Sequence, residues 1–157
     1  DSAGTATSFE RPWLQVAMDF ATMGWAIGVS IGIASANRGV PVVCITGDGS
    51  YLMSGQEITV ALEEELCTVF VVLNDGALGM VKHNQILRGV ERIASDLPAV
   101  NFKAMAESLG VPGFEVRNQA DLENLPFEEI FKRKGPTLLD IHIDRRVPPP
   151  YVKKTQN

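Results

Sequence analysis

The stretch VPVVCITGDGSYLMSGQE, residues 40–57, decides the fold. Its first part, Val40–Thr46, is an apolar run rich in β-branched side chains, which is typical of a parallel strand covered on both faces. We expect the strand to end at Gly47, and Leu52–Leu66 has the apolar spacing of an amphipathic helix. This order of buried strand, glycine turn and helix favours an α/β fold.

The rest of the chain continues the alternation of strands and helices. Before residues 40–57, we expect a helix over Trp13–Asn37. After the helix Leu52–Leu66, we expect a strand over Thr68–Leu73, a helix near Met80–Leu87 and a polar connection around Arg88–Pro98. The remaining elements are a helix over Asn101–Leu109, a strand over Phe114–Val116, a helix over Leu122–Phe131 and a strand over Thr137–Ile143. This pattern predicts an open parallel sheet with helices on both faces. We expect one domain over residues 1–147 and a loose Pro-rich and basic tail over residues 148–157.

The first expected helix carries a regular stripe of glycines. Gly24, Gly28 and Gly32 recur every four residues and would share one helical face. Each glycine costs about 1 kcal/mol relative to alanine inside a helix. The stripe therefore predicts that another backbone packs very closely on this face, at a domain or subunit interface.

The composition indicates a globular domain with one hydrophobic core. The 157 residues include 14 basic and 19 acidic side chains, whereas a nucleic-acid binder normally carries a basic stripe. No apolar run approaches the ~20 residues that span a membrane. Cys44 and Cys67 lie in apolar stretches, which favours free thiols in a reducing, cytoplasmic compartment. The chain opens with DSAGTATSFERPW, without an initiator Met or a leader, so we expect a piece of a longer protein.

Two loops at the ends of expected strands carry the chemistry: GDGS at residues 47–50 and NDGALGM at residues 74–80. Ligands bind beyond the carboxyl ends of the strands in an open α/β sheet. Gly47 and Gly49 flank Asp48 directly before a helix, a place suited to phosphate. A carboxylate there would repel phosphate unless a divalent cation lies between them. Oxygen ligands suit Mg²⁺, and Asp75 at the next strand end is the expected second ligand. Alternatively, both acids only form Asx-type turns.

The two loops together resemble the cofactor fingerprint of thiamine diphosphate enzymes. The resemblance is carried by GDGSYLMSGQE followed by LNDGALGMV, and extends to FATMGWAIGVSIGIA, NFKAMAESLGVPGFEV and GPTLLDIHID. Within that family the chain is most similar to the acetolactate synthase group of carboligases and decarboxylases. The resemblance implies the thiamine diphosphate-binding fold and the pyrophosphate-binding domain, which is normally the C-terminal third of such a subunit.

The resemblance also implies a set of binding residues. The metal ligands fall on Asp48, Asp75 and the backbone oxygen of Ala77, with Asn74 in place of Asp75 if the register shifts by one. Gly47, the first residue of the GDGS loop, is also expected to contact the cofactor. Backbone N–H groups would bind the diphosphate at four positions: Gly49, Ser50, Leu78 and Gly79. Gly4–Ala6 falls where the family has another turn that contacts the diphosphate.

A second implied segment holds the pyrimidine ring of the cofactor. Ala21, Thr22 and Met23 match it, with the Ala21 carbonyl and the Met23 N–H on the ring edge. The Met23 side chain would lie under the cofactor and enforce its bent, reactive conformation; ordinary core packing is the other interpretation of this methionine. We expect Met80, which ends the metal loop, to face the substrate.

The resemblance implies an enzyme that uses thiamine diphosphate and Mg²⁺ to act on 2-oxo acids, by carboligation or decarboxylation. The catalytic glutamate would come from the pyrimidine-binding domain of the same or another subunit, in a homo-oligomeric dimer or tetramer. FAD would require a further domain. Asn84 stands where acetolactate synthases usually carry Trp, which leaves the substrate open. We expect neither a nucleic-acid nor a membrane partner.

The motifs are also compatible with other classes of α/β domain. The principal alternative is a non-catalytic α/β module that binds a phosphate or nucleotide. A Rossmann dinucleotide domain requires G-x-G-x-x-G after its first strand, which the sequence lacks. A metal-dependent phosphatase would require further acids or a nucleophile at other strand ends, and only Asp48 and Asp75 are offered.

Overall fold

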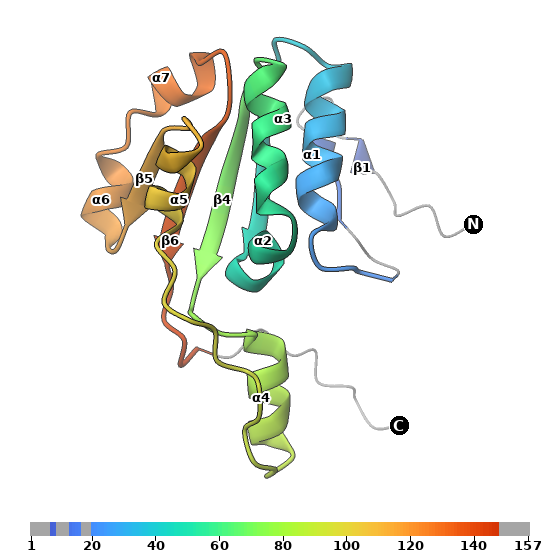
Figure 1. The fold of residues 1–157 in the computed structure, drawn as a ribbon, viewed down its shortest axis with the longest axis vertical. Coiled ribbons are helices and arrows are strands. Elements are labelled where there is room, and N and C mark those ends of the chain that lie inside the picture. The colour runs from blue at the N-terminus through green and yellow to red at the C-terminus, as the bar shows by residue number, and fades with distance from the viewer. Residues whose placement is uncertain (1–6, 9–12, 17–19, 148–157) are drawn as a thin grey trace.

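The computed structural model describes residues 7–8, 13–16 and 20–147. Its centre is a four-stranded parallel sheet with the strand order β3-β4-β6-β5 (Figure 1). These strands are β3 (Val42–Gly47), β4 (Thr68–Asn74), β5 (Gly113–Val116) and β6 (Thr137–His142). The helices are α1 (Trp25–Ala36), α2 (Asp48–Ser54), α3 (Ile58–Glu63), α4 (Gly79–Leu87), α5 (Phe102–Ser108), α6 (Gln119–Glu123) and α7 (Phe127–Lys132), and a short antiparallel pair joins β1 (Thr7–Ser8) to β2 (Trp13–Leu14).

Helices pack on both faces of the sheet, as the sequence predicts. On one face, the main core cluster gathers side chains of α1, α3 and α5 against three strands; it includes Ile27, Ile58, Phe102, Cys44, Phe70 and Leu138. On the other face, Ile130 of α7 packs against Val69 and Leu139. Successive strand residues alternate between these two clusters because side chains alternate across a sheet. The predicted fold class is confirmed.

The first predicted helix is wrong in its start. The structure begins α1 at Trp25 and places β2 at Trp13–Leu14. Two left-handed residues, Ala21 (φ 49) and Gly24 (φ 89), interrupt any helix before that point. Within the described residues, a Cβ added to Gly28 or Gly32 would meet nothing within 4 Å, so this chain itself packs no backbone there, and the predicted contact with another domain or subunit stays a prediction.

Two other predicted helices are broken into shorter ones. The segment expected as one helix over Leu52–Leu66 starts earlier, at Asp48, and divides at a 3₁₀ turn over Gly55–Glu57. The ring of Tyr51 lies where a Cβ of Gly55 would be, 2.4 Å from the nearest ring atom. The expected helix Leu122–Phe131 divides into α6 and α7 around Pro126, which lacks the N–H that a continuous helix needs.

The substitution Gly113→Ala is expected to lower the free energy of unfolding by about 1–3 kcal/mol. A Cβ at Gly113 would lie 2.8 Å from the carbonyl oxygen and 2.9 Å from the Cα of Lys103, so α5 would have to move off β5. Denaturant unfolding measures this. Gly28→Ala is the control: it lies in open space on α1 and should stabilise by up to about 1 kcal/mol. Equal stability of the two variants would contradict the close packing of α5 on β5.

Among the residues that the structure describes, no helix is both long and apolar enough to cross a bilayer. The predicted tail at residues 148–157 and the predicted turn Gly4–Ala6 lie outside the described residues.

Candidate functional site

The two predicted loops meet at the carboxyl end of the sheet, on the Asp48 side chain. Asp48 is the first residue of α2 and is only 4% exposed. Its Oδ1 accepts a hydrogen bond from the Gly49 N–H (2.7 Å), and its Oδ2 accepts one from the Gly76 N–H (2.8 Å). Because β3 and β4 are paired up to Gly47 and Leu73, the chain leaves both strands at the same level. A single buried carboxylate therefore joins the GDGS loop to the NDGALGM loop.

Asp75 adds a second carboxylate beside the first. Its Oδ1 accepts from the Ala77 N–H at 3.2 Å. Burial raises the pKa of Asp48, and the charge of Asp75 raises it further, while the N–H groups of Gly49 and Gly76 oppose the rise. Ala77 itself is buried. The site thus concentrates two acidic side chains around a buried backbone segment, an arrangement that a cation would relieve.

Asn74, the other candidate ligand, is engaged elsewhere. Its side-chain Nδ2 donates to Oδ1 of Asp140 on β6 at 2.9 Å. The resemblance places the ligand on Asp75, with Asn74 in its place only if the register shifts by one. The structure orients the amide of Asn74 toward β6 and leaves Asp75 beside Asp48.

The four predicted N–H donors differ in what they already bind. The Gly49 N–H donates to Asp48, and the Leu78 N–H donates to the Ser95 carbonyl at 2.8 Å. Ser50 and Gly79 lie in the first turns of α2 and α4, where helical N–H groups have no partner within the helix. A Cβ at Gly79 would come within 3.2 Å of Asp75 Oδ2, so the start of α4 closely approaches that carboxylate.

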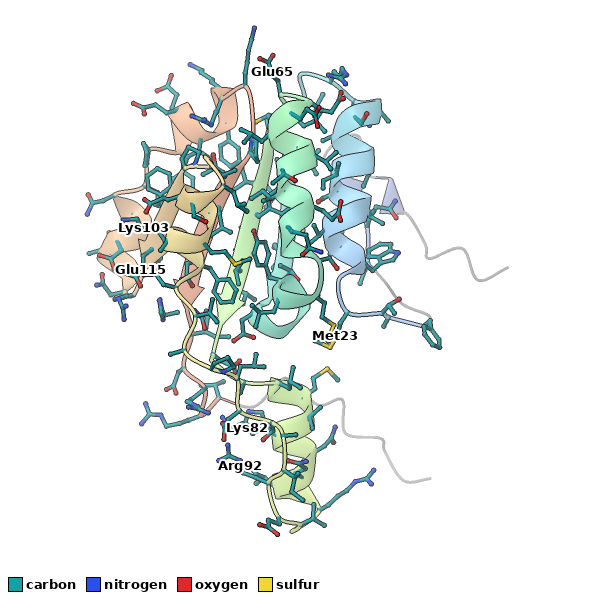
Figure 2. All side chains as sticks on the ribbon, viewed as in Figure 1. Met23, Glu65, Lys82, Arg92, Lys103 and Glu115 are labelled. Atoms are coloured by element: carbon teal, nitrogen blue, oxygen red, sulfur yellow. The ribbon has the colours of Figure 1, made fainter. Side chains whose placement is uncertain are left out.

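The predicted pyrimidine segment lies against the same loop. Oγ of Ser50 accepts a hydrogen bond from the Gly24 N–H at 2.7 Å. A Cβ added to Gly49 would lie 3.2 Å from the Cε of Met23, so the tip of Met23 reaches the GDGS loop. Figure 2 shows Met23 at the end of the main body that faces α4. Ala21 and Thr22, just before it, are exposed.

Met80 stands on the helix that projects beyond the sheet. α4 extends past the carboxyl ends of the strands (Figure 1), and Met80 on its first turn is 69% exposed. Met23 is 43% exposed. The two methionines predicted to contact the cofactor and substrate are therefore accessible in this chain and do not fill its core.

Two residues of the site region, Ser54 and Asp140, carry no motif that marks them in the sequence. A Cβ added to Gly24 would lie 2.2 Å from the Oγ of Ser54, which explains why residue 24 is glycine. Asp140, fully buried, binds Asn74, the first residue of the NDGALGM loop. The only available signal for Asp140 was an acid within the apolar strand segment TLLDIH.

Comparisons with known proteins agree on one family. The profile described as "Thiamine pyrophosphate enzyme, C-terminal TPP binding domain" matches residues 3–141. The chain is 36% identical over 138 residues to the acetolactate synthase isozyme 1 large subunit of Escherichia coli (strain K12), covering 85% of this chain and 24% of that protein. It is 31% identical over 136 residues to the acetolactate synthase large subunit of Porphyra purpurea, covering 85% and 23%.

Solved structures share the fold. The crystal structure of benzoylformate decarboxylase from Polynucleobacter necessarius has a TM-score of 0.72 at 24% identity, covering 83% of this chain and 25% of that chain. A Rhodococcus jostii RHA1 thiamine diphosphate-dependent 4-hydroxybenzoylformate decarboxylase has a TM-score of 0.71 at 25% identity, covering 78% and 23%. The chain thus spans about a quarter of the length of these relatives.

Proposed function

Because the chain belongs to the thiamine pyrophosphate enzymes, as their C-terminal cofactor-binding domain, we propose that Mg²⁺ binds to Asp48, Asp75 and the carbonyl of Ala77. The cation would hold the diphosphate group of thiamine diphosphate against this chain. The non-catalytic phosphate-binding module fits the comparisons less well, since the relatives are enzymes.

The convergence of Asp48 and Asp75 carries this proposal. Two carboxylates and a carbonyl form an all-oxygen donor set, which suits Mg²⁺ and leaves positions for phosphate oxygens and water. The engagement of Asn74 by Asp140 supports Asp75 as the ligand in the second loop. Each carboxylate already accepts backbone N–H groups, which fixes its orientation before a metal arrives.

When bound, thiamine diphosphate supplies the carbanion chemistry that breaks and forms bonds beside a 2-oxo acid carbonyl. The residues of the chain bind and orient. We assign the diphosphate to the first-turn N–H groups of α2 and α4, at Ser50 and Gly79. Gly49 and Leu78 would contribute through the shape of their loops, since their N–H groups are bonded within the chain. Met23 would support the cofactor from the segment that the Ser50–Gly24 bond holds in place.

The activity proposed for the whole protein is carboligation or decarboxylation of 2-oxo acids. The named relatives are acetolactate synthase large subunits and two decarboxylases, so both outcomes have precedent in the family. We propose that a pyrimidine-binding domain of the same or another subunit supplies the catalytic glutamate, within a homo-oligomer. A cytoplasmic location is consistent with the free thiols of Cys44 and Cys67.

The test is a calorimetric titration of the full-length protein with thiamine diphosphate, with Mg²⁺ and with a chelator. Binding should require the divalent cation. Metal-independent binding of equal affinity would overturn the assignment of the acidic site.

Met80→Ala is expected to change the ratio of kcat/KM values among 2-oxo acids by about tenfold, while cofactor affinity stays within about threefold. Met80 is exposed beyond the metal loop, whereas the proposed cofactor ligands are buried or in the loops. Leu87→Ala is the control, because Leu87 is similarly exposed (68%) at the far end of α4. Equal changes in the two variants would contradict a substrate-facing role for Met80.

The raised pKa of Asp48 predicts the sign of a pH effect on stability in the absence of metal. Folding disfavours its charged form, so the contribution of this group is fully present below its unfolded pKa and is lost as the pH rises through its folded pKa. The free energy of unfolding of the wild type, measured relative to Asp48→Asn, should therefore fall as the pH rises from ~4 towards neutrality. A difference that stays constant or grows with pH would show that the pKa is not raised.

A further inference from the structure

The buried Asp140 carboxylate has no role in the proposed function, yet it is bonded directly to the metal loop. Asp140 is fully buried on β6, where an unpaired carboxylate would be very costly. Its Oδ1 accepts from Asn74 Nδ2 at 2.9 Å, and its Oδ2 accepts from the Phe102 N–H at 3.1 Å. One side chain thus joins the end of β4, the start of α5 and β6.

Asn74 is held to β6 at two points. Its side chain binds Asp140, and its carbonyl accepts from the Ile143 N–H at 3.0 Å. The next residues are the proposed ligand Asp75 and then Gly76, whose N–H reaches Asp48. The direction in which the chain leaves β4 is therefore set by Asn74, immediately before the ligands are presented.

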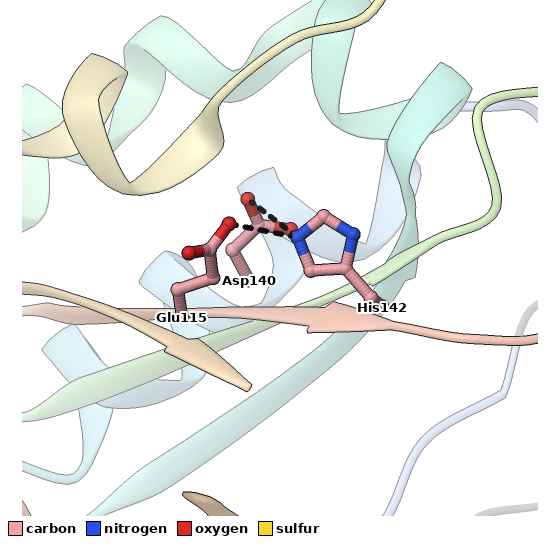
Figure 3. A group of neighbouring side chains, drawn as sticks. All are labelled: Glu115, Asp140 and His142. Atoms are coloured by element: carbon pink, nitrogen blue, oxygen red, sulfur yellow. Dashed lines mark hydrogen bonds and ion pairs between the residues drawn. The ribbon is translucent and has the colours of Figure 1, made fainter. Parts of the chain in front are cut away.

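Glu115 and His142 lie beside Asp140 (Figure 3). Nε2 of His142 lies 3.0 Å from Glu115 Oε1 and 3.9 Å from Asp140 Oδ2. Glu115 also pairs with Arg117 at 2.6 Å. These side chains are already bonded to one another, so the group is not assigned a metal of its own.

We infer that Asp140 and Asn74 are positioning residues for the Mg²⁺ and diphosphate site, an inference that rests on the proposed function. Asn74 on β4 donates one hydrogen bond to Asp140 on β6, 66 residues away in sequence. Partners that orient metal ligands are typically worth about 10–100-fold in metal affinity. We give the Asn74–Asp140 pair this orienting role because its hydrogen bond fixes the residue directly before the proposed ligand Asp75.

A donor–acceptor swap in the full-length protein tests the inference. Asn74→Asp sets two carboxylates against each other. Asp140→Asn keeps its oxygen for the Phe102 N–H and turns an NH₂ toward Asn74, which can accept from it only by turning its own amide over. Asn74→Asp should weaken binding of Mg²⁺ with thiamine diphosphate by about 10–100-fold in calorimetry, and Asp140→Asn should weaken it less. Each should also accelerate amide hydrogen exchange in the peptide over residues 74–79 of the cofactor-free protein. The double variant restores a complementary pair and should recover most of both losses.

Glu115→Gln is the matched control, because it changes the same group but keeps both hydrogen bonds of Asp140. Its cofactor affinity and loop exchange should stay near wild type. All binding is measured well below the unfolding midpoint, so a merely structural role would lower the midpoint and leave affinity and loop exchange unchanged.

If Asp140→Asn fails to fold, Asn74→Ala replaces it, since Asn74 is only partly buried. Folded Asn74→Ala protein with wild-type affinity and exchange would overturn the inference. A swapped double variant that binds no better than Asn74→Asp alone would also overturn it. Failure of the proposed function looks different: the wild type itself would then bind thiamine diphosphate without regard to Mg²⁺.

Discussion

Asp48→Ala should abolish Mg²⁺-dependent binding of thiamine diphosphate, with a loss of affinity of at least ~100-fold. The substitution removes a proposed ligand and the side chain that joins the two loops through Gly49 and Gly76. The diphosphate would then lie near Asp75 without a properly held cation between them, so that attraction becomes repulsion. Calorimetry of the full-length variant, with and without Mg²⁺, measures the loss.

Asp48→Asn separates the metal role from the structural one. It keeps the side-chain volume and one acceptor, whereas Asp48→Ala leaves two backbone donors unpaired at about 1–3 kcal/mol each if they stay buried. Both variants should lose metal-dependent binding, but Asp48→Ala should lose more stability in thermal unfolding. Cofactor affinity within about threefold of wild type in folded Asp48→Asn protein would contradict the assignment of Asp48 as a ligand.

The sequence was a good guide where local pattern and physical role coincide. The apolar strand before Gly47, the second strand before Asn74 and the parallel order follow from hydrophobic runs and glycine turns, and the structure confirms them. The meeting of the two loops could also be predicted, because the carboxyl ends of adjacent parallel strands lie together. Asn101, the first residue of the helix expected over Asn101–Leu109, caps α5 by accepting from the Ala104 N–H.

Features that depend on long-range contacts could not be predicted. The start of α1 is set by the left-handed Gly24, which lies against Ser54 some 30 residues later, whereas its apolar sequence suggested a longer helix. Asp140 gains its role only through strand pairing that brings β6 beside β4. Neither contact leaves a local pattern in the sequence, because the two partners of each contact are far apart along the chain.

The isolated 157-residue chain is expected to bind thiamine diphosphate weakly and to turn over no 2-oxo acid. It spans about a quarter of the length of its curated relatives. Of the proposed cofactor contacts, it supplies those to the diphosphate and those to one edge of the pyrimidine ring. Met23 and Met80 are 43% and 69% exposed, so in this chain alone the cofactor would be open to water on that side. We therefore expect a second domain to exclude water and supply the remaining contacts.

The measurement compares the isolated chain with the full-length protein, each with pyruvate, thiamine diphosphate and Mg²⁺, after light scattering has given the mass of each. Activity should appear only in the larger assembly, because the glutamate that activates the cofactor is proposed to come from the pyrimidine-binding domain. Adding that domain as a separate polypeptide should restore part of the activity and protect Met23 and Met80 from oxidation by peroxide. Robust decarboxylation by an isolated monomer would show that this chain suffices for catalysis and that the second domain is not required.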